Sequence, residues 1–327
     1  MQHADEGARI FRICNACRYC EGFCAVYPAM ERRTAFPPEE LHYLANLCHN
    51  CGECYYACQY APPHEFAVNV PQLLAKIRLE SYEQFAWPRW LARAYRRNGL
   101  VVAVLLAACI AALLVAAPRD FYAATGLFAA AAGYVVIALS VGAVRFWRVA
   151  GTSQSISAKA AMAGLKAALS LRYLASSRVL SRRLFHHLTF YGFLLCFAST
   201  SVAAFYHHLL HRDAPYPLLS APVLLGTAGG AGLLVGTAGL LVLKLRRDSA
   251  IKDEAQTGMD LGFIALLFLT SLTGLALLMQ RKTQMMPAIL ALHLGSVLAL
   301  FLTLPCGKFA HGIYRAAALL RNSIELG

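Results

Sequence analysis

The stretch CNACRYCEGFC at residues 14–24 returns with the same cysteine spacing as CHNCGECYYAC at residues 48–58. Together the two runs use eight of the eleven cysteines of the chain. Thiolates at this spacing reach successive iron corners of one cubane, and in two-cluster ferredoxins the fourth cysteine of each run closes the other cluster. The runs therefore predict two [4Fe-4S] clusters: cluster 1, held by Cys14, Cys17, Cys20 and Cys58, and cluster 2, held by Cys48, Cys51, Cys54 and Cys24.

Two other uses of cysteine fit this pattern less well. Structural zinc sites pair C-x2-C knuckles and have no place for a third cysteine at the same spacing. A disulfide framework needs an oxidising compartment, and the residues before Cys14 do not resemble a secretory signal peptide. We therefore expect residues 1–86 to form a ferredoxin-type helical module, with one helix starting at Pro37-Pro38 and another from Val70 to about Phe85.

The rest of the chain has the composition of a membrane protein. Of the 327 residues, 58% are hydrophobic and only 14% are charged, and the mean hydropathy is +0.51. A linker over residues 87–98 combines tryptophans and arginines, as headgroup layers require. Six segments then have the length of a transmembrane helix, approximately residues 99–117, 121–144, 184–206, 218–243, 259–279 and 287–305. The fold class is thus mainly α, with a six-helix bundle over residues 99–327. The glycines between Gly226 and Gly236 predict close helix packing.

The net charge of +13 is explained by basic residues that flank the predicted membrane segments. Basic residues flank the apolar segments rather than forming one patch, which argues against nucleic-acid binding and follows the positive-inside rule. Loops on one side carry only Arg119, Arg212, Arg281 and Lys282. The other side carries most of the positive charge, at Arg145, Arg148, Lys159, Lys166, Arg172, Arg178, Arg182, Arg183, Lys244, Arg246, Arg247, Lys252, Lys308, Arg315 and Arg321. We expect a multi-pass protein of the bacterial inner membrane with both termini and the clusters in the cytoplasm, and a surface helix near residues 156–178.

Histidines at the ends of membrane segments are functional candidates. The third segment begins with His186 and His187 and ends near His207 and His208, while the sixth carries His293, with His311 beyond its cytoplasmic end. Because these segments are antiparallel, the histidines pair by depth: His186 or His187 with His311, and His207 or His208 with His293. If one helix continues through Pro305 and Gly307, His293 and His311 share a face at opposite membrane surfaces. Two bis-histidine b-type haems are favoured over one; the alternative is that these are interfacial residues with wet polar tips.

These motifs resemble known families. The stretch from His293 to His311, which ends LPCGKFAH, resembles a haem-binding helix of the cytochrome b subunit of nitrate reductase. Over nearly the whole chain, the cysteine runs, RLFHHLTFYGF at residues 183–193 and GKFAHG at residues 307–312 resemble the tricarballylate (citrate) utilization protein B family, and also the C-terminal part of a cobalamin-biosynthetic flavohaemoprotein. The resemblance implies a cytoplasmic FAD-dependent dehydrogenase as electron donor, similar to a tricarballylate dehydrogenase, and membrane quinone as acceptor.

Two other functions stay open at this point. By analogy with the flavohaemoprotein, the chain could be the haem and iron-sulfur component of an oxygenase-type system. It could also serve a membrane disulfide reductase, although the paired Cys-Cys-Gly motif of that class is missing from the sequence. Any quinone reductase activity would require the flavoprotein partner, because no Rossmann or Walker loop predicts a tightly bound nucleotide.

Overall fold

The computed structural model describes residues 2–116, 121–176 and 180–327. All regular structure in these ranges is helical, so the mainly α fold is confirmed. The elements are α1 (Ala4–Cys17), α2 (Val26–Glu31), α3 (Pro38–Leu47), α4 (Glu53–Tyr56), α5 (Val70–Phe85), α6 (Arg89–Ala116), α7 (Phe121–Ala150), α8 (Ala158–Leu169), the 3-10 helix η1 (Arg172–Ser176), α9 (Leu180–His208), α10 (Ala221–Leu245), the 3-10 helix η2 (Ser249–Ile251), α11 (Glu254–Gln280), α12 (Met286–Thr303) and α13 (Ala310–Glu325).

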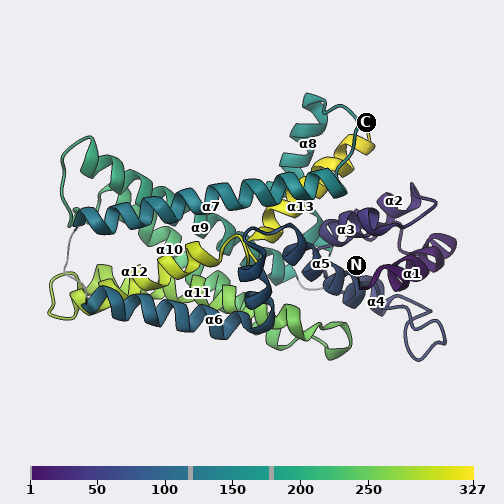
Figure 1. Ribbon diagram of the computed structural model, residues 1–327, viewed down its shortest axis with the longest axis horizontal. Coiled ribbons are helices and arrows are strands. Elements are labelled where there is room, and N and C mark those ends of the chain that lie inside the picture. The colour runs from purple at the N-terminus through teal and green to yellow at the C-terminus, as the bar shows by residue number, and fades with distance from the viewer. Residues whose placement is uncertain (1, 117–120, 177–179) are drawn as a thin grey trace.

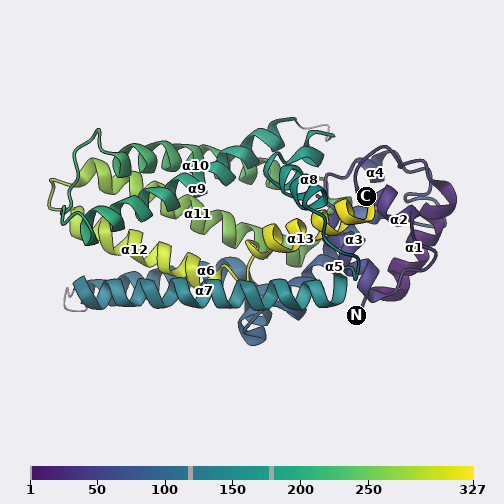
Figure 2. The ribbon, with the colours of Figure 1, turned by 90° about the horizontal axis from the view of Figure 1, so that it is seen from above.

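The molecule is elongated, and its two parts follow the order of the chain. The long helices α6, α7, α9, α10, α11 and α12 run along the long axis and form a bundle (Figures 1 and 2). The short helices α1 to α5 gather at one end of this bundle, where α8, α13 and the C-terminus also lie. The cysteine-rich module is therefore placed at a single end of the apolar helices.

Five helices are long and apolar enough to cross a membrane: Gly126–Ala150, Ser181–His208, Ala221–Leu245, Glu254–Gln280 and Met286–Thr303. A sixth span is possible in α6, which bends by 109° between Arg89–Arg97 and Gly99–Val115. This bend falls where the sequence predicts the linker to meet the first span. Residues 117–120, with Arg119, and residues 177–179, with Arg178, lie outside the described residues.

The two helices predicted in the cysteine-rich module are confirmed. Helix α3 starts at Pro38, after the extended Pro37, since a proline at the first helical position loses no hydrogen bond. Helix α5 starts after Asn69, whose side chain accepts a hydrogen bond from the Gln72 N–H at 3.2 Å. Such caps satisfy backbone donors that the first helical turn leaves free.

Helix α5 joins the module to the bundle through aromatic packing. Phe85 is buried, and its ring lies edge-on to Phe146 of α7 at 5.5 Å and to Tyr314 of α13 at 6.0 Å. Leu74 and Ile77 on the same helix are fully buried in a core that continues into the bundle. Burying rings of this size stabilises an interface by several kcal/mol, roughly 25 cal/mol for each Å² of apolar surface.

A charged network holds α13 against the module. The Glu325 carboxylate accepts hydrogen bonds from Arg33 and Arg321, both at 2.7 Å. The same two arginines also bind Glu40 of α3. Because these side chains are largely shielded from water, the four charges fix the C-terminal helix to α3 more firmly than exposed ion pairs would.

The close packing predicted from the glycines is confirmed between α9 and α10. A Cβ atom on Gly229 would lie 2.8 Å from the Cys196 nitrogen, and one on Gly236 would lie 2.6 Å from the Thr189 nitrogen. Gly230 faces Leu275 of α11 instead. Only glycine permits backbones to approach so closely.

The helix that carries His293 does not continue to His311, so the condition under which the two histidines would share one helix face is not met. Helix α12 ends at Thr303, and α13 begins at Ala310 after a turn that contains Pro305. Proline has no N–H to donate and its ring clashes with the preceding turn, so the helix stops there.

In the segment predicted to form a surface helix, α8 packs against α13. A Cβ on Gly164 of α8 would lie 3.1 Å from the Leu320 Cα.

Candidate iron-sulfur and haem sites

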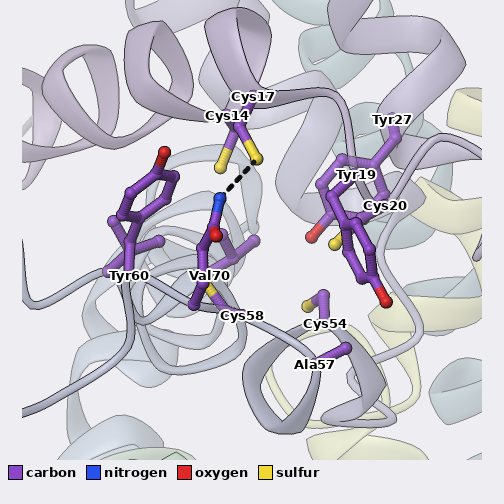
Figure 3. Close-up of a pocket in the computed structure, with 12 residues that line it drawn as sticks. Cys14, Cys17, Tyr19, Cys20, Tyr27, Cys54, Ala57, Cys58, Tyr60 and Val70 are labelled. Atoms are coloured by element: carbon purple, nitrogen blue, oxygen red, sulfur yellow. Dashed lines mark hydrogen bonds between the residues drawn. The ribbon is translucent and has the colours of Figure 1, made fainter. Parts of the chain in front are cut away.

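The four cysteines predicted to hold cluster 1 line one cavity of about 250 Å³. Figure 3 shows Cys14 and Cys17 pointing into it from the last turn of α1, with Cys20 and Cys58 on other walls. The aromatic rings of Tyr19, Tyr27 and Tyr60 also line this cavity. Every lining residue lies between positions 14 and 70, so the cavity belongs entirely to the cysteine-rich module.

The four cysteines predicted to hold cluster 2 line a second, smaller cavity of about 20 Å³. They are Cys24, Cys48, Cys51 and Cys54. Cys54 lines both cavities, so the two sites are neighbours. Cys58 lines only the first cavity and Cys24 only the second, and the crossed pairing of these fourth cysteines stays a prediction.

The loop that carries Cys48 and Cys51 is folded tightly against the bundle. Gly52 has φ +93°, in the left-handed region, and a Cβ at this position would lie 2.7 Å from the Ile251 Cδ1 in η2. The left-handed backbone conformation favours glycine here. The predicted site of cluster 2 therefore lies next to the bundle, and that of cluster 1 lies further away.

The chemistry of these side chains suits iron-sulfur clusters. Burial, with neighbouring cysteines adding to it, raises the pKa of Cys14 to about 12 and that of Cys24 to about 12. Crowded thiolates need a compensating cation, which cluster iron supplies. Among the described residues no three His, Cys, Asp or Glu side chains converge closely enough for a single metal ion.

Polar groups of the module also point at these sulfurs. The Asn50 N–H donates a hydrogen bond to the Cys48 Sγ at 3.3 Å, and the Gln59 amide donates to the Cys17 Sγ at 3.8 Å (Figure 3). The buried His49 Nε2 lines the cluster 2 cavity and has no hydrogen-bond partner among the described groups. An unpaired buried nitrogen of this kind fits a site in which a bound cluster would supply the missing hydrogen-bond acceptor.

At the end of the bundle next to the module, one pair of the candidate haem ligands meets. The rings of His186 in α9 and His311 in α13 have centres 6.1 Å apart at 66°. Two imidazoles on opposite sides of one metal ion would be spaced about 6 Å, from about 2 Å per metal–nitrogen bond and about 1 Å from each nitrogen to its ring centre. The His311 Nδ1–H donates to the Lys308 carbonyl at 2.5 Å, which leaves Nε2 available as a ligand.

The other candidates have different surroundings. His187 stacks on Tyr191 at 5.7 Å, one turn along α9. At the far end of the bundle, His293 shares a hydrogen bond with Thr273 of α11 at 3.1 Å. His207 pairs with Asp213 at 3.0 Å and lies edge-on to the exposed His208. The facing pair of rings is thus His186 with His311.

Two arginines connect this histidine pair to cluster 2. Arg182, one helical turn before His186, donates to the His49 carbonyl at 2.7 Å and to the Asn50 carbonyl at 3.1 Å. Arg315, one turn after His311, donates to the Leu47 carbonyl at 3.0 Å. From the sequence, both arginines are explained only as positive-inside residues that flank membrane segments. Their spacing of four residues from each histidine was the available signal, since such residues share a helix face.

A buried triad of charges lies beside His311. Asp260 of α11 pairs with Lys244 of α10 at 2.6 Å and with Lys308 at 2.9 Å. Burial, opposed by Asp260, lowers the pKa of Lys308 to about 8. Two lysines share one carboxylate, so this end of the bundle carries excess positive charge.

Comparison with known proteins covers both parts of the chain. The family described as citrate utilization protein B matches residues 114–326, and the citrate utilization protein B Fer4-like domain matches residues 7–84. The curated citrate utilization protein B of Escherichia coli is 48% identical over 98% of this chain and 92% of that protein. No solved structure matches the chain.

Proposed function

This chain belongs to the citrate utilization protein B family, and we propose that it carries electrons from a cytoplasmic FAD-dependent dehydrogenase to quinone in the bacterial inner membrane. The Fer4-like domain supports an iron-sulfur electron-transfer role, and the five membrane-length helices support a membrane location. The dehydrogenase partner would resemble a tricarballylate dehydrogenase. Residues 1–86 would be the iron-sulfur domain, residues 87–98 the linker and residues 99–327 the haem domain.

One observation carries this proposal: the cluster 2 loop is bound by arginines placed one turn from two facing histidines. Arg182 and His186 share a face of α9, and Arg315 and His311 share a face of α13. Four residues of α-helix rise about 6 Å. The loop with Cys48 and Cys51 is therefore held within about one helical turn of the proposed haem ligands.

When bound, the clusters and haem supply one-electron carriers that can divide the electron pair of a reduced flavin. The cysteines of each cavity would hold and orient one cluster. His186 and His311 would hold a b-type haem, and the Lys308 carbonyl fixes the His311 ring. The second haem, on His293 with His207 or His208, stays a prediction.

The flavoprotein would approach the cluster 1 cavity. This cavity is lined only by residues of the module, and the Tyr19 side chain at its rim is 68% exposed. The cluster 2 cavity instead lies against η2, α9 and α13. An electron donor at cluster 1 and an acceptor in the bundle would therefore lie on opposite sides of cluster 2.

The test is gentle purification of the full chain from native membranes, with iron, sulfide, haem and flavin measured on one sample. We expect about eight cluster irons per chain, one or two b-type haems and a co-purifying flavoprotein. A sample without acid-labile sulfide would contradict the proposal. Carbon monoxide should not bind the reduced protein, because a bis-histidine haem has no open position; a carbon monoxide complex would favour the oxygenase-type alternative.

A further inference from the structure

Four arginines surround the cluster 2 loop: three of them bind backbone carbonyls and the fourth binds a side-chain amide. Besides Arg182 and Arg315, the buried Arg78 of α5 donates to the carbonyls of Ala45 and Cys48, both at 2.9 Å. Arg247, just after α10, donates to the Asn50 Oδ1 at 2.8 Å. None of these four arginines forms an ion pair with a described carboxylate. We call Arg78, Arg182, Arg247 and Arg315 the arginine collar.

An excess of buried cations needs anions to balance it, since charges in a low dielectric interact strongly. Glu53, in the same loop, is the carboxylate that acts on Cys51. Burial lowers the pKa of Arg247 and Asp260 opposes this effect, but the Lys244–Asp260–Lys308 triad as a whole carries one net positive charge. The collar and the triad together therefore carry more positive than negative charge, and a thiolate-bound cluster is the anion that would balance it.

The cluster 1 cavity has different electrostatics. In the cluster 2 loop, Arg78, Arg182 and Arg315 donate to backbone carbonyls between Leu47 and Asn50. The cluster 1 cavity has no arginine or lysine among its lining residues, and Arg18, which donates to the Asn15 carbonyl at 3.1 Å, is exposed. Shielded cations therefore lie at the cluster 2 loop, whereas water screens the cation at the cluster 1 loop.

We propose that the arginine collar raises the reduction potential of cluster 2 above that of cluster 1. Reduction adds one electron and no bond, so the reduced form carries one more negative charge, which nearby cations stabilise; net charge, hydrogen bonds and exposure set cluster potentials. The collar arginines would act on cluster 2 through their positive charge and by holding the loop that carries its cysteines. This inference rests on the proposed function, and it gives the electron flow a direction from the partner-facing site toward the bundle.

The test is a redox titration of the full chain in detergent, followed by electron paramagnetic resonance. Cys17→Ser, which changes a cluster 1 ligand, identifies the signals of that site. At a fixed potential, Arg247→Gln and Arg315→Gln should each lower the ratio of reduced to oxidised cluster 2 by about tenfold, or about 59 mV for a one-electron couple. Arg247→Lys keeps the charge and should restore most of the ratio.

Arg18→Gln is the matched control, because Arg18 is an exposed cation between Cys17 and Cys20 of cluster 1. It should leave the cluster 2 titration unchanged. If both clusters are present and the two glutamine variants titrate like the wild type, the collar does not tune cluster 2, although the electron-transfer function stands. If the wild type has no cluster signal at all, the proposed function fails and this inference fails with it.

Discussion

At the scale of single residues, two adjacent histidines of α9 have different surroundings. His186 and His187 are neighbours in sequence, yet successive residues of a helix point about 100° apart. One ring faces His311 and the other stacks on Tyr191. The choice between them follows from how α9 is rotated against α13.

Replacing these histidines should separate their roles. His186→Ala or His311→Ala should remove the haem at the inner end of the bundle, about half of the total if two haems are bound. His187→Ala should retain it, because that ring faces away from the pair. Pyridine haemochrome assays per mole of protein measure the difference. Loss of haem in His187→Ala with retention in His186→Ala would reverse the assignment.

Cysteine replacement tests the cluster ligands in the same way. Cys51→Ser should lower the cluster iron and acid-labile sulfide by up to about half, since it weakens one of two clusters. It should leave the haem bound, yet slow haem reduction by the native flavoprotein partner with its substrate. Cys196→Ser in α9 is the control and should change neither quantity. Haem reduction at the normal rate in Cys51→Ser would contradict the proposed order of carriers.

The sequence displays the cysteine spacing directly but does not reveal the arginine collar, for a physical reason. Cluster ligation depends on local spacing, which the residues at 14–24 and 48–58 display directly. The collar depends on tertiary contacts such as Arg182 with the His49 carbonyl, between residues more than a hundred positions apart. Without the fold, Arg182, Arg247 and Arg315 look like ordinary positive-inside charges.

At the scale of elements, the α9–α10 contact holds in place the helix that carries His186. A methyl group at Gly236 would lie 2.5 Å from the Thr189 Oγ1 and 2.8 Å from the Phe185 carbonyl, next to His186. Gly236→Ala should therefore destabilise the bundle by about 1–3 kcal/mol, as overpacking does. Thermal unfolding in detergent, with haem absorbance as the probe, measures this.

Gly133→Ala in α7 is the matched substitution, because a Cβ there would meet no atom within 4 Å. It should leave the midpoint temperature unchanged or slightly raised, since alanine favours helix. Equal midpoint temperatures for the two variants would show that contact with α9 does not constrain position 236.

The ion pairs between α13 and the cysteine-rich module also fix the arrangement of the helices. Burial alone would raise the pKa of Glu325, but hydrogen bonds and charges from Arg33 and Arg321 outweigh it and lower that pKa. A carboxyl with a lowered pKa stabilises the fold above its unfolded pKa, and this stability is lost as the pH falls through the folded value. At neutral pH the contribution is complete.

Glu325→Gln should therefore weaken the docking of the module at neutral pH by roughly 1.5–3 kcal/mol, the scale of hydrogen bonds to charged groups. Hydrogen exchange of the α3 amides, compared with that of α1, measures the loosening. Glu65→Gln, at an exposed position, should leave α3 protected. Unchanged α3 exchange in Glu325→Gln would mean that apolar packing alone holds the module.

At the scale of the whole molecule, both described chain ends lie at the iron-sulfur end of the bundle (Figures 1 and 2). The positive-inside rule predicts that this end faces the cytoplasm. A green fluorescent protein fused after Gly327 should therefore fluoresce, and alkaline phosphatase inserted within residues 213–219 should be active in the periplasm. The reverse pattern of reporter activity would invert the orientation and exclude a cytoplasmic dehydrogenase as the donor.

The break between α12 and α13 also has a consequence for biosynthesis. Because the chain turns after Thr303, α13 leaves the bundle and carries His311, Arg315, Arg321 and Glu325 beneath the module. The ribosome makes the cysteine runs first, and it makes α13 only after all the spans. A chain interrupted before residue 310 would lack both the facing histidine pair and the ion pairs that join α13 to the cysteine-rich module. The order of translation thus makes α13 the closing step of assembly, which joins the two redox sites only in a chain whose membrane part has already been synthesised.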